Sequence, residues 1–183
     1  MKRQSGFNLT ELIIVVAIVA ILLGIGLPSY RYITNSYRMS SEVNGLLGDL
    51  MYARAEALKE GQGVTVCVSN GVNCLGTTAW QAGWVVFSNP NGAANPPPGS
   101  VLRVQAAFTG PGGVTDNFNA TNGVSAVTYN REGFATTAAG FPSTTITLKD
   151  PTGKAVWTRC LLISAQGTLT TETPANSPSG TCL

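Results

Sequence analysis

The chain contains no histidine, and only 11% of its 183 residues are charged. Without histidine, neither a Ser-His-Asp triad nor a Cys-His pair can be assembled, which excludes the commonest nucleophilic mechanisms of hydrolases. The sequence also lacks a C-x-x-C pair, the spacing typical of zinc sites and of redox-active cysteines. We therefore predict that the protein is not an enzyme and that it holds no cofactor and no metal.

Other catalytic candidates are equally scarce. The glycine-rich run Gly110-Pro111-Gly112-Gly113 does not resemble a phosphate-binding loop, because neither a lysine nor a helical pattern follows it. The carboxylates of the second half of the chain are scattered among turn signals, and we expect them to be solvated: Asp116, Glu132, Asp150 and Glu172.

Charge is almost absent from the N-terminal segment. Between Arg3 and Arg31 the only charged side chain is Glu11, and an unbroken apolar run follows it. The segment 7–27 spans roughly 31 Å as an α-helix, which is enough to cross the hydrocarbon core of a bilayer. The basic residues before it place the N-terminus in the cytoplasm and everything beyond the helix outside.

A carboxylate in such a segment costs several kcal/mol unless it is paired, so Glu11 is a candidate functional residue. The small residue Gly6 precedes the apolar run, and no A-x-A cleavage site follows it. Cleavage after Gly6 would free an α-amine on Phe7, the nearest available cation, on the same chain or on a neighbouring subunit. Pairing within one chain and a protonated Glu11 in lipid remain alternatives.

The segment 28–61 changes from wholly apolar to amphipathic. Apolar residues recur at spacings of three, four and seven, which predicts a continued helix that ends at Gly61. Pro28 removes a backbone donor, so we expect a helix break there. We expect the stripe of Leu46, Leu50 and Leu58 to pack against the core of a globular head.

After Gly63 the chain reads as short strands separated by turns rich in Asn, Gly and Pro. No helical pattern intervenes, which favours antiparallel over parallel sheets. The strands expected from Val, Thr, Ile and aromatic content are Val64–Ser69, Gly83–Ser88, Val101–Phe108, Val124–Asn130, Thr144–Asp150 and Lys154–Ser164.

The N-terminal motif Gly6-Phe7-Asn8-Leu9-Thr10-Glu11 resembles the prepilin leader of type IV pilins and of type II secretion pseudopilins. The resemblance implies that a prepilin peptidase cleaves after Gly6 and methylates Phe7. It also implies that Glu11, the fifth residue of the mature chain, sets the register between subunits. Pro28 matches the proline that commonly follows the first apolar block in this family.

The run Ala53-Arg54-Ala55-Glu56-Ala57, followed by Val64-Thr65-Val66-Cys67, is similar to the GspH/FimT/FimU group of minor pilins and pseudopilins. The turn Arg131-Glu132-Gly133-Phe134 and the segment 159–167 also fit this group. The implied fold is α+β, with a long N-terminal α-helix and an antiparallel β-sandwich head. The expected division is a leader at 1–6, a helix at 7–61 (7–27 for membrane and assembly, 28–61 amphipathic) and a head at 62–183.

By resemblance, the chain is a minor pilin that helps to initiate a type IV pilus and is incorporated near its tip. It would span the bacterial inner membrane once, with its head in the periplasm, and later reach the cell-surface pilus. The implied partners are other minor and major pilin subunits, the prepilin peptidase, the inner-membrane assembly platform and inner-membrane lipid. The alternative is a minor pseudopilin of a type II secretion system.

A DNA-binding pilin is a third alternative, which the sequence disfavours. Some FimT-type pilins bind DNA through a Gly-Arg-x-Arg motif, but the matching segment Gly167-Thr168-Leu169-Thr170 lacks both arginines. Removal of the leader takes two of the 11 basic residues and leaves the mature chain near neutral, whereas phosphate binding needs clustered cations. A weak patch would form only if the fold gathers Arg103, Arg131, Lys149, Lys154 and Arg159.

All four cysteines follow the apolar helix, and in an oxidising periplasm an even number of cysteines favours disulfides. Three pairings are open. We favour Cys67–Cys74, which closes a small loop, and Cys160–Cys182, which ties the C-terminal tail to a strand. The second bond would stabilise the fold by about 3 kcal/mol through loop-closure entropy.

Overall fold

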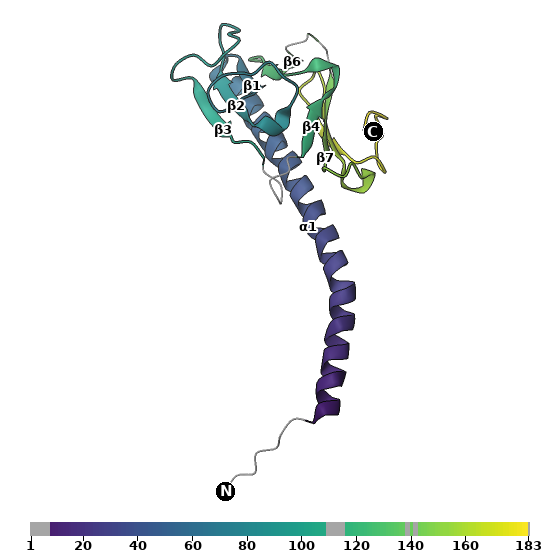
Figure 1. The fold of residues 1–183 in the computed structure, drawn as a ribbon. Helices are drawn as coiled ribbons and strands as arrows, with labels where there is room; N and C mark the ends of the chain where they lie inside the picture. Colours follow the sequence, from purple (N-terminus) through teal and green to yellow (C-terminus); the bar gives the residue numbers. More distant parts are fainter. Residues whose placement is uncertain (1–7, 109–115, 138–139, 141–142, 183) are drawn as a thin grey trace. The chain divides into compact units, whose positions relative to one another are not determined.

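The structure, a computed structural model, describes residues 8–108, 116–137, 140 and 143–182. A long helix, α1 (Leu9–Glu60), leads into a β-rich head (Figure 1). The chain divides into two compact units, Met1–Arg38 and Met39–Leu183. The boundary lies inside α1 and not at its end, because the second half of the helix is part of the core of the head.

Helix α1 begins where the Asn8 carbonyl oxygen accepts the backbone N–H groups of Glu11 at 3.0 Å and Leu12 at 3.2 Å. It ends before Gly61, which has a positive φ of 66° and whose N–H reaches back to the Ala57 carbonyl oxygen. The left-handed conformation stops the helix at little cost because glycine has no Cβ. The predicted C-terminal limit is therefore correct to within one residue.

The predicted helix break at Pro28 is absent, since α1 continues through this position to Glu60. Proline removes its own N–H from the ladder of hydrogen bonds, and its ring crowds the carbonyl four residues earlier. The helical residues on either side keep their own bonds, which maintain one continuous helix in this conformation.

The first antiparallel sheet has the strand order β3-β2-β1-β5-β6. Central strand β1 pairs with both β2 and β5, and its residues are buried on both faces. The strands are β1 (Val64–Val68), β2 (Trp84–Ser88), β3 (Val101–Gln105), β5 (Ala126–Tyr129) and β6 (Ala135–Thr137).

The second antiparallel sheet has the strand order β4-β7-β8-β9. Strand β4 belongs to this sheet, the next two strands along the chain, β5 and β6, belong to the first sheet, and β7, β8 and β9 then complete the second. These strands are β4 (Asn117–Ala120), β7 (Thr144–Lys149), β8 (Arg159–Ile163) and β9 (Leu169–Glu172). Among the described residues, the connections contain the 3-10 turns η1 (Trp80–Ala82), η3 (Thr121–Gly123) and η4 (Ala155–Trp157).

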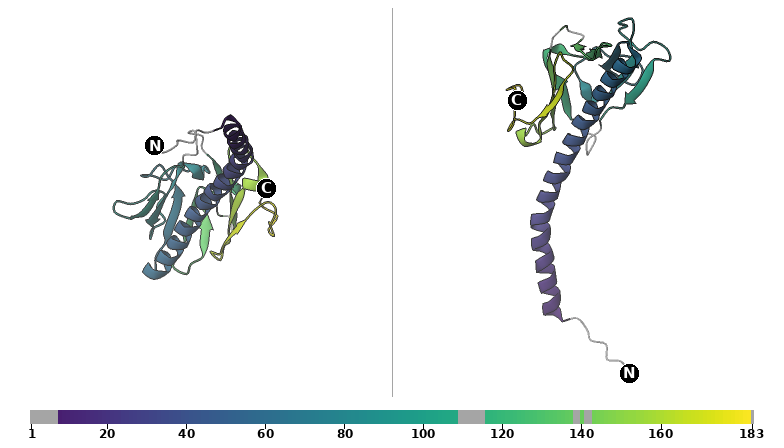
Figure 2. Two further views of the ribbon diagram at one scale, coloured as in Figure 1. Left: turned by 90° about the horizontal axis from the view of Figure 1, so that it is seen from below. Right: turned by 180° about the vertical axis from the view of Figure 1, so that it is seen from behind.

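Both sheets share one hydrophobic core with the second half of α1. Figures 1 and 2 show the teal strands β1, β2 and β3 of the first sheet on one side of this helical segment and the green and yellow strands of the second sheet on the other. Leu46 and Leu50 of α1 are fully buried in this core, as expected. Their neighbours in the same cluster include Val66, Trp84 and Val86 from the first sheet and Ile146, Leu148 and Leu161 from the second.

The expected fold class, a long helix followed by antiparallel sheets, is confirmed, but the strand prediction was wrong in places. Strands β4, β6 and β9 were not predicted. The segment expected to run from Lys154 to Ser164 as one strand begins with the turn η4, and its strand starts only at Arg159.

Candidate functional site

The first half of α1 presents an apolar surface without an internal partner among the described residues. Every residue from Leu9 to Gly26 is exposed. Large apolar side chains here range in exposure from 47% at Val19 to 74% at Leu9. Burying such a side chain is favourable by about 1.5–3 kcal/mol, so this surface has a strong tendency to enter lipid or to pack against other chains.

Glu11 is exposed in the first turn of α1, where the helix dipole favours a negative charge. The helix is long and apolar enough to cross a membrane. Gly6 and Phe7, the predicted cleavage and methylation positions, lie outside the described residues. Glu11 is therefore positioned one turn into an apolar helix, as the register hypothesis requires, while its pairing partner stays a prediction.

Arg54 connects the second half of α1 to both sheets, a role that sequence analysis missed. Its Nε donates to the Gly133 carbonyl oxygen and its Nη2 donates to the Gln166 carbonyl oxygen, each at 3.0 Å. The first carbonyl lies in the β5–β6 turn and the second in the β8–β9 turn. A charged donor with two carbonyl acceptors contributes more than a neutral hydrogen bond, so Arg54 fixes the helix to the head.

The two turns held by Arg54 also contact each other directly. The Ala135 N–H donates to the Ala165 carbonyl oxygen at 2.9 Å. Gly167 has a φ of 75°, and a Cβ there would clash with the carbonyl oxygen of Gly133. This turn therefore requires glycine for both its backbone conformation and its close packing.

Tyr129 lies in the core of the head, with its ring fully buried. Burial raises the pKa of its hydroxyl far above the ordinary tyrosine value, against the opposing charge of Arg54. The phenol is therefore neutral at any physiological pH and acts as a packing residue.

Asp49 provides a second connection between α1 and the head. Its Oδ2 accepts the indole N–H of Trp84 at 2.8 Å, and its Oδ1 accepts Arg103 at 3.0 Å. The same guanidinium lies 3.9 Å from the centre of the Tyr52 ring. These contacts attach the helix to β2 and β3, and no sequence motif indicated them.

Leu58 corrects one expectation about the core. Leu46 and Leu50 are buried, but Leu58 is 52% exposed, and its neighbour on the same face, Met51, is 59% exposed. The two residues border a surface groove of about 420 Å³ whose opposite wall contains Leu169. Leu58 lies outside the core because the Gly133 and Gly167 turns occupy the space between the helix end and the sheets.

The structure joins Cys67 to Cys74 and Cys160 to Cys182, the pairing favoured above. The first disulfide covers the outer face of the first sheet, where Cys67 forms a small buried cluster with Val85 and Phe87. The second fixes the C-terminal segment to β8.

The C-terminal segment is also held by Glu172 at the end of β9. Its Oε2 accepts the hydroxyls of Ser177 at 2.8 Å and Ser179 at 2.7 Å. Hydrogen bonds from Ser179 and Ser177 hold the pKa of Glu172 below its ordinary value. The carboxylate thus acts as a structural acceptor for the tail.

The expectation that the carboxylates of the head are solvated was wrong for three of the four. Asp116, Asp150 and Glu172 are buried, and only Glu132 is exposed. Asp150 is buried because it organises a turn, in which it accepts the Thr152 hydroxyl at 2.6 Å and the Lys154 N–H at 3.2 Å. A turn signal in the sequence can therefore conceal a buried acceptor.

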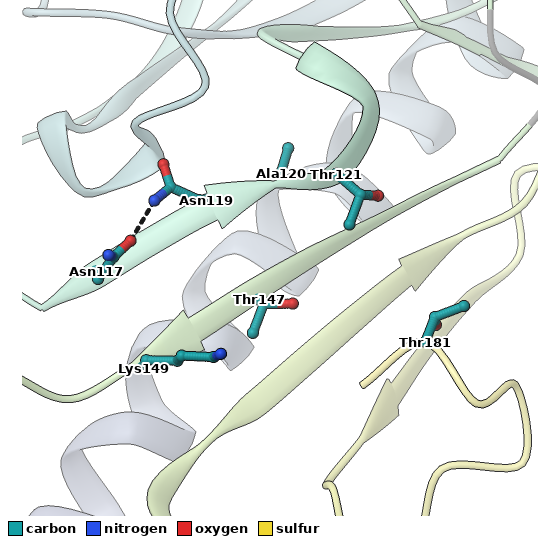
Figure 3. A pocket seen from close by; sticks show the side chains of 7 residues that line it. All are labelled: Asn117, Asn119, Ala120, Thr121, Thr147, Lys149 and Thr181. Atoms are coloured by element: carbon teal, nitrogen blue, oxygen red, sulfur yellow. Dashed lines mark hydrogen bonds between the residues drawn. The ribbon is translucent and has the colours of Figure 1, made fainter. Parts of the chain in front are cut away.

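A polar pocket of about 310 Å³ opens on the outer face of the second sheet. Figure 3 shows Asn117 and Asn119 from β4 beside Lys149 from β7, with Thr181 of the C-terminal segment opposite. The Asn119 amide donates to the Asn117 side-chain oxygen. Among the residues that line this pocket, Lys149 carries the only charge.

The basic residues considered for DNA binding do not form one patch. Arg103 on the first sheet binds Asp49, whereas Arg159 on the second donates to the Val156 and Thr158 carbonyl oxygens. Lys154 lies 5.1 Å from the centre of the Trp157 ring. Nucleic-acid affinity depends on several cations that face the phosphates together, and Arg103 is already engaged by the carboxylate of Asp49.

Comparisons with known proteins agree with this architecture. The family model for the type II transport protein GspH matches residues 42–167, and the model for the prokaryotic N-terminal methylation motif matches residues 1–27. No curated protein matches the chain. Two crystal structures of the type IV minor pilin FimU from Pseudomonas aeruginosa are similar in fold, each with 20% sequence identity.

The TM-scores to these two structures are 0.59 and 0.53. The matched regions cover 80% and 78% of this chain and 97% of the FimU chain in each case. At this identity the similarity is evidence for the fold alone. The matched region includes nearly all of the crystallised FimU chain.

Proposed function

The chain belongs to the GspH family, and we propose that it is a minor pilin of the FimU kind. In this proposal it helps to initiate a type IV pilus and is incorporated near the tip. The fold and the family are those of structural subunits of pilus-like assemblies and not of enzymes.

One observation carries the proposal: α1 begins with an exposed apolar surface that contains a single carboxylate. Twelve large apolar side chains between Leu9 and Ile25 are exposed, and Glu11 is the only charged residue among them. Burial of these side chains against other subunits is favourable by about 1.5–3 kcal/mol each. That gain exceeds the several kcal/mol needed to bury a carboxylate, provided that Glu11 finds a cation.

The cation in this proposal is the α-amine of Phe7 on a neighbouring subunit. The prepilin peptidase cleaves after Gly6 and methylates Phe7, and methylation leaves the amine able to carry a positive charge. A subunit placed one step out of register would leave Glu11 unpaired among apolar side chains. The pair therefore selects one axial position during assembly.

The proposed path of the protein follows from the same segment. The chain spans the inner membrane once, with its head in the periplasm, and the assembly platform moves it from lipid into the fibre. Its direct partners are other minor pilins and the major pilin. Because Glu11 is retained, another subunit can pair above it, which favours a position near the tip over the extreme tip.

A minor pseudopilin of a type II secretion system is the second candidate function. The description of the matched family names type II transport, and pseudopilins share the same leader. Affinity purification of the tagged protein after crosslinking distinguishes the two. Recovery with pilins supports the main proposal, and recovery with secretion pseudopilins supports the alternative.

The proposal is tested by Glu11→Ala, with Glu60→Ala as a matched control on the same helix. Glu60 is also exposed, but it lies at the end of α1, outside the apolar segment. We expect Glu11→Ala to insert into the membrane normally but to fall about tenfold or more in sheared pili. Removing one partner of a buried ion pair costs about 3–5 kcal/mol, because the other charge stays buried without compensation. Glu60→Ala should reach the pili normally. Equal recovery of both variants in pili would contradict the proposal.

A further inference from the structure

The loop that follows β2, residues 89–99, forms one wall of a pocket on the outer face of the first sheet. The pocket has a volume of about 430 Å³, and its floor contains Thr65 of β1 and Thr128 of β5. The loop that begins after β1 forms the opposite wall through Cys74 and Leu75. Ligand pockets in proteins typically enclose about 300–1,000 Å³, so this volume suits a small ligand.

Both walls are fixed by covalent and hydrogen bonds. The Cys67–Cys74 disulfide holds the wall formed by Cys74 and Leu75 to β1, and the Leu75 N–H donates to the Val68 carbonyl oxygen at 2.8 Å. The wall formed by residues 89–99 is linked to it because the Asn95 side-chain oxygen accepts the Cys74 N–H at 3.0 Å. A pocket with walls fixed in advance loses little entropy when a ligand binds.

Asn89 shapes the wall formed by residues 89–99 and connects it to the floor of the pocket. Its side-chain oxygen accepts the Ala93 N–H at 2.6 Å, and its amide nitrogen donates to the Ala93 carbonyl oxygen at 3.0 Å. The same nitrogen donates to the Thr65 hydroxyl at 2.9 Å. Asn89 is only 5% exposed, so it acts as an internal support for the loop.

The hydroxyls of the floor form a chain that ends in the pocket. Thr65 Oγ1 accepts from Asn89 and lies 2.8 Å from Thr128 Oγ1. When the Thr65 hydroxyl donates its hydrogen bond to Thr128 Oγ1, the Thr128 hydroxyl can donate to a group in the pocket. Ser125 and Asn95, which also line the pocket, add a hydroxyl and an amide.

From this chemistry we propose that the pocket binds one residue of an uncharged saccharide. The described residues that line it include no Asp, Glu, Lys or Arg, so a charged ligand would be desolvated without an opposite charge. The floor supplies hydroxyl groups for the hydroxyls of a sugar. Leu75, Ala93 and Ala94 supply small apolar contacts for its C–H faces.

An extended peptide fits the pocket less well than a sugar. The floor is the face of β1 and β5, and β1 is already paired with β2 and β5 along both of its edges. Its backbone groups are therefore used within the sheet and cannot add a further strand. The recognition groups that remain are side-chain hydroxyls and amides, which suit a ligand rich in hydroxyls.

The test uses the full chain in lauryldimethylamine oxide, because detergents with sugar head groups would compete. Methyl glucoside, methyl galactoside and methyl mannoside are each added at about 10 mM, which detects a Kd of about 1 mM. Saturation-transfer NMR reports binding. Methyl glucuronide and an acetylated dialanine amide serve as the charged and the peptide comparisons.

Two variants and one control locate the site. Ala94→Trp fills the mouth of the pocket and should abolish saturation transfer, whereas Thr128→Val removes one hydroxyl and should weaken binding about fivefold. Thr147→Val, a half-buried strand threonine on the second sheet, should bind as the unmodified chain does. Unchanged near-ultraviolet circular dichroism of each variant excludes unfolding as the cause of a loss.

The proposal predicts that at least one neutral glycoside binds, and that the two pocket variants reduce its signal while the control does not. It is overturned if no neutral glycoside gives a signal, if Ala94→Trp leaves the signal intact, or if the glucuronide or the peptide binds more tightly. Because the site does not involve α1, this result is independent of fibre assembly.

Discussion

The two halves of α1 differ in composition and in burial: the first is almost wholly apolar and exposed, and the second is amphipathic with its apolar face buried. Between Leu9 and Ile25 the large apolar side chains are 47–74% exposed, whereas Leu46, Leu50, Ala53 and Ala57 in the second half are all 0% exposed. The second half has sheets of its own chain to cover it. A helix that is apolar on all sides needs an environment that surrounds it, so the first half depends on lipid or on other subunits.

The polar contacts of the two halves differ in the same way. Arg54 and Asp49 in the second half each bind two groups of the head. Glu11 is the only charged side chain in the apolar part of the first half, and its proposed partner lies on another molecule. The comparison therefore predicts that head variants affect folding and that Glu11 variants affect assembly alone.

Arg54→Ala should have the largest effect on the head. It leaves the Gly133 and Gln166 carbonyl oxygens without their charged donor, and we expect a loss of about 3 kcal/mol in the free energy of unfolding. Arg131→Ala, an exposed arginine in the same turn as Gly133, should change stability by less than about 0.5 kcal/mol. Denaturant unfolding monitored by tryptophan fluorescence measures both. Equal effects would show that Arg54 does not connect α1 to the head.

Loss of the Cys160–Cys182 disulfide should have an effect of similar size, and loss of Cys67–Cys74 a smaller one. Replacing Cys160 and Cys182 with serine opens a loop with a sequence separation of 22 and should cost about 3 kcal/mol. Replacing Cys67 and Cys74, with a separation of 7, should cost about 2 kcal/mol. Digestion without reductant, followed by mass spectrometry, verifies the pairing. A crossed pairing, such as Cys74 with Cys160, would refute this assignment.

Gly48→Ala should have a smaller effect of opposite sign. Gly48 lies on the exposed face of the second half of α1, where an added Cβ would meet nothing within 4 Å among the described residues. Alanine in a helix interior is more stable than glycine by about 0.5–1 kcal/mol, so the head should become more stable by this amount. The midpoint of thermal unfolding measures the gain. A destabilised variant would mean that this face is packed in the isolated protein.

The pH dependence of the C-terminal segment should be the smallest effect. Because the folded-state pKa of Glu172 lies below its unfolded value, its contribution is present above the unfolded pKa and is lost as the pH falls through the folded pKa. Glu172→Gln should therefore lower the thermal midpoint at pH 7 relative to the unmodified chain, and the difference should shrink below about pH 4. A difference that is the same at pH 7 and pH 3 would contradict this role of the carboxylate.

Periodic apolar patterns predicted much of the fold, because they reflect which face is buried. The helix end at Gly61 and the centres of β1, β2 and β7 followed from such patterns. Strand β4 was missed because Asn117-Phe118-Asn119-Ala120 has little strand propensity. It forms because Phe118 is buried in the core while β7 supplies the hydrogen bonds.

The features of the site that sequence analysis missed depend on contacts between distant residues. Arg54 and Gly133 are 79 positions apart, and only the folded chain brings them together. Leu58 fits the helical stripe of buried residues, but two turns of the head fill the space that its side chain would occupy. Motifs near Arg54, Gly133 and Gly167 supported the resemblance to the family, although they did not reveal that the three residues contact one another.

The central claim is that Glu11 of one subunit pairs with the N-terminal amine of another. Zero-length carbodiimide coupling in intact fibres, followed by mass spectrometry of the linked peptides, tests it most directly. The account predicts an amide between the Glu11 carboxylate and the methylated amine of a neighbouring subunit, absent in Glu11→Gln. A chain that retains residues 1–6 in the fibre, or a Glu11 linked only within its own chain, would contradict it.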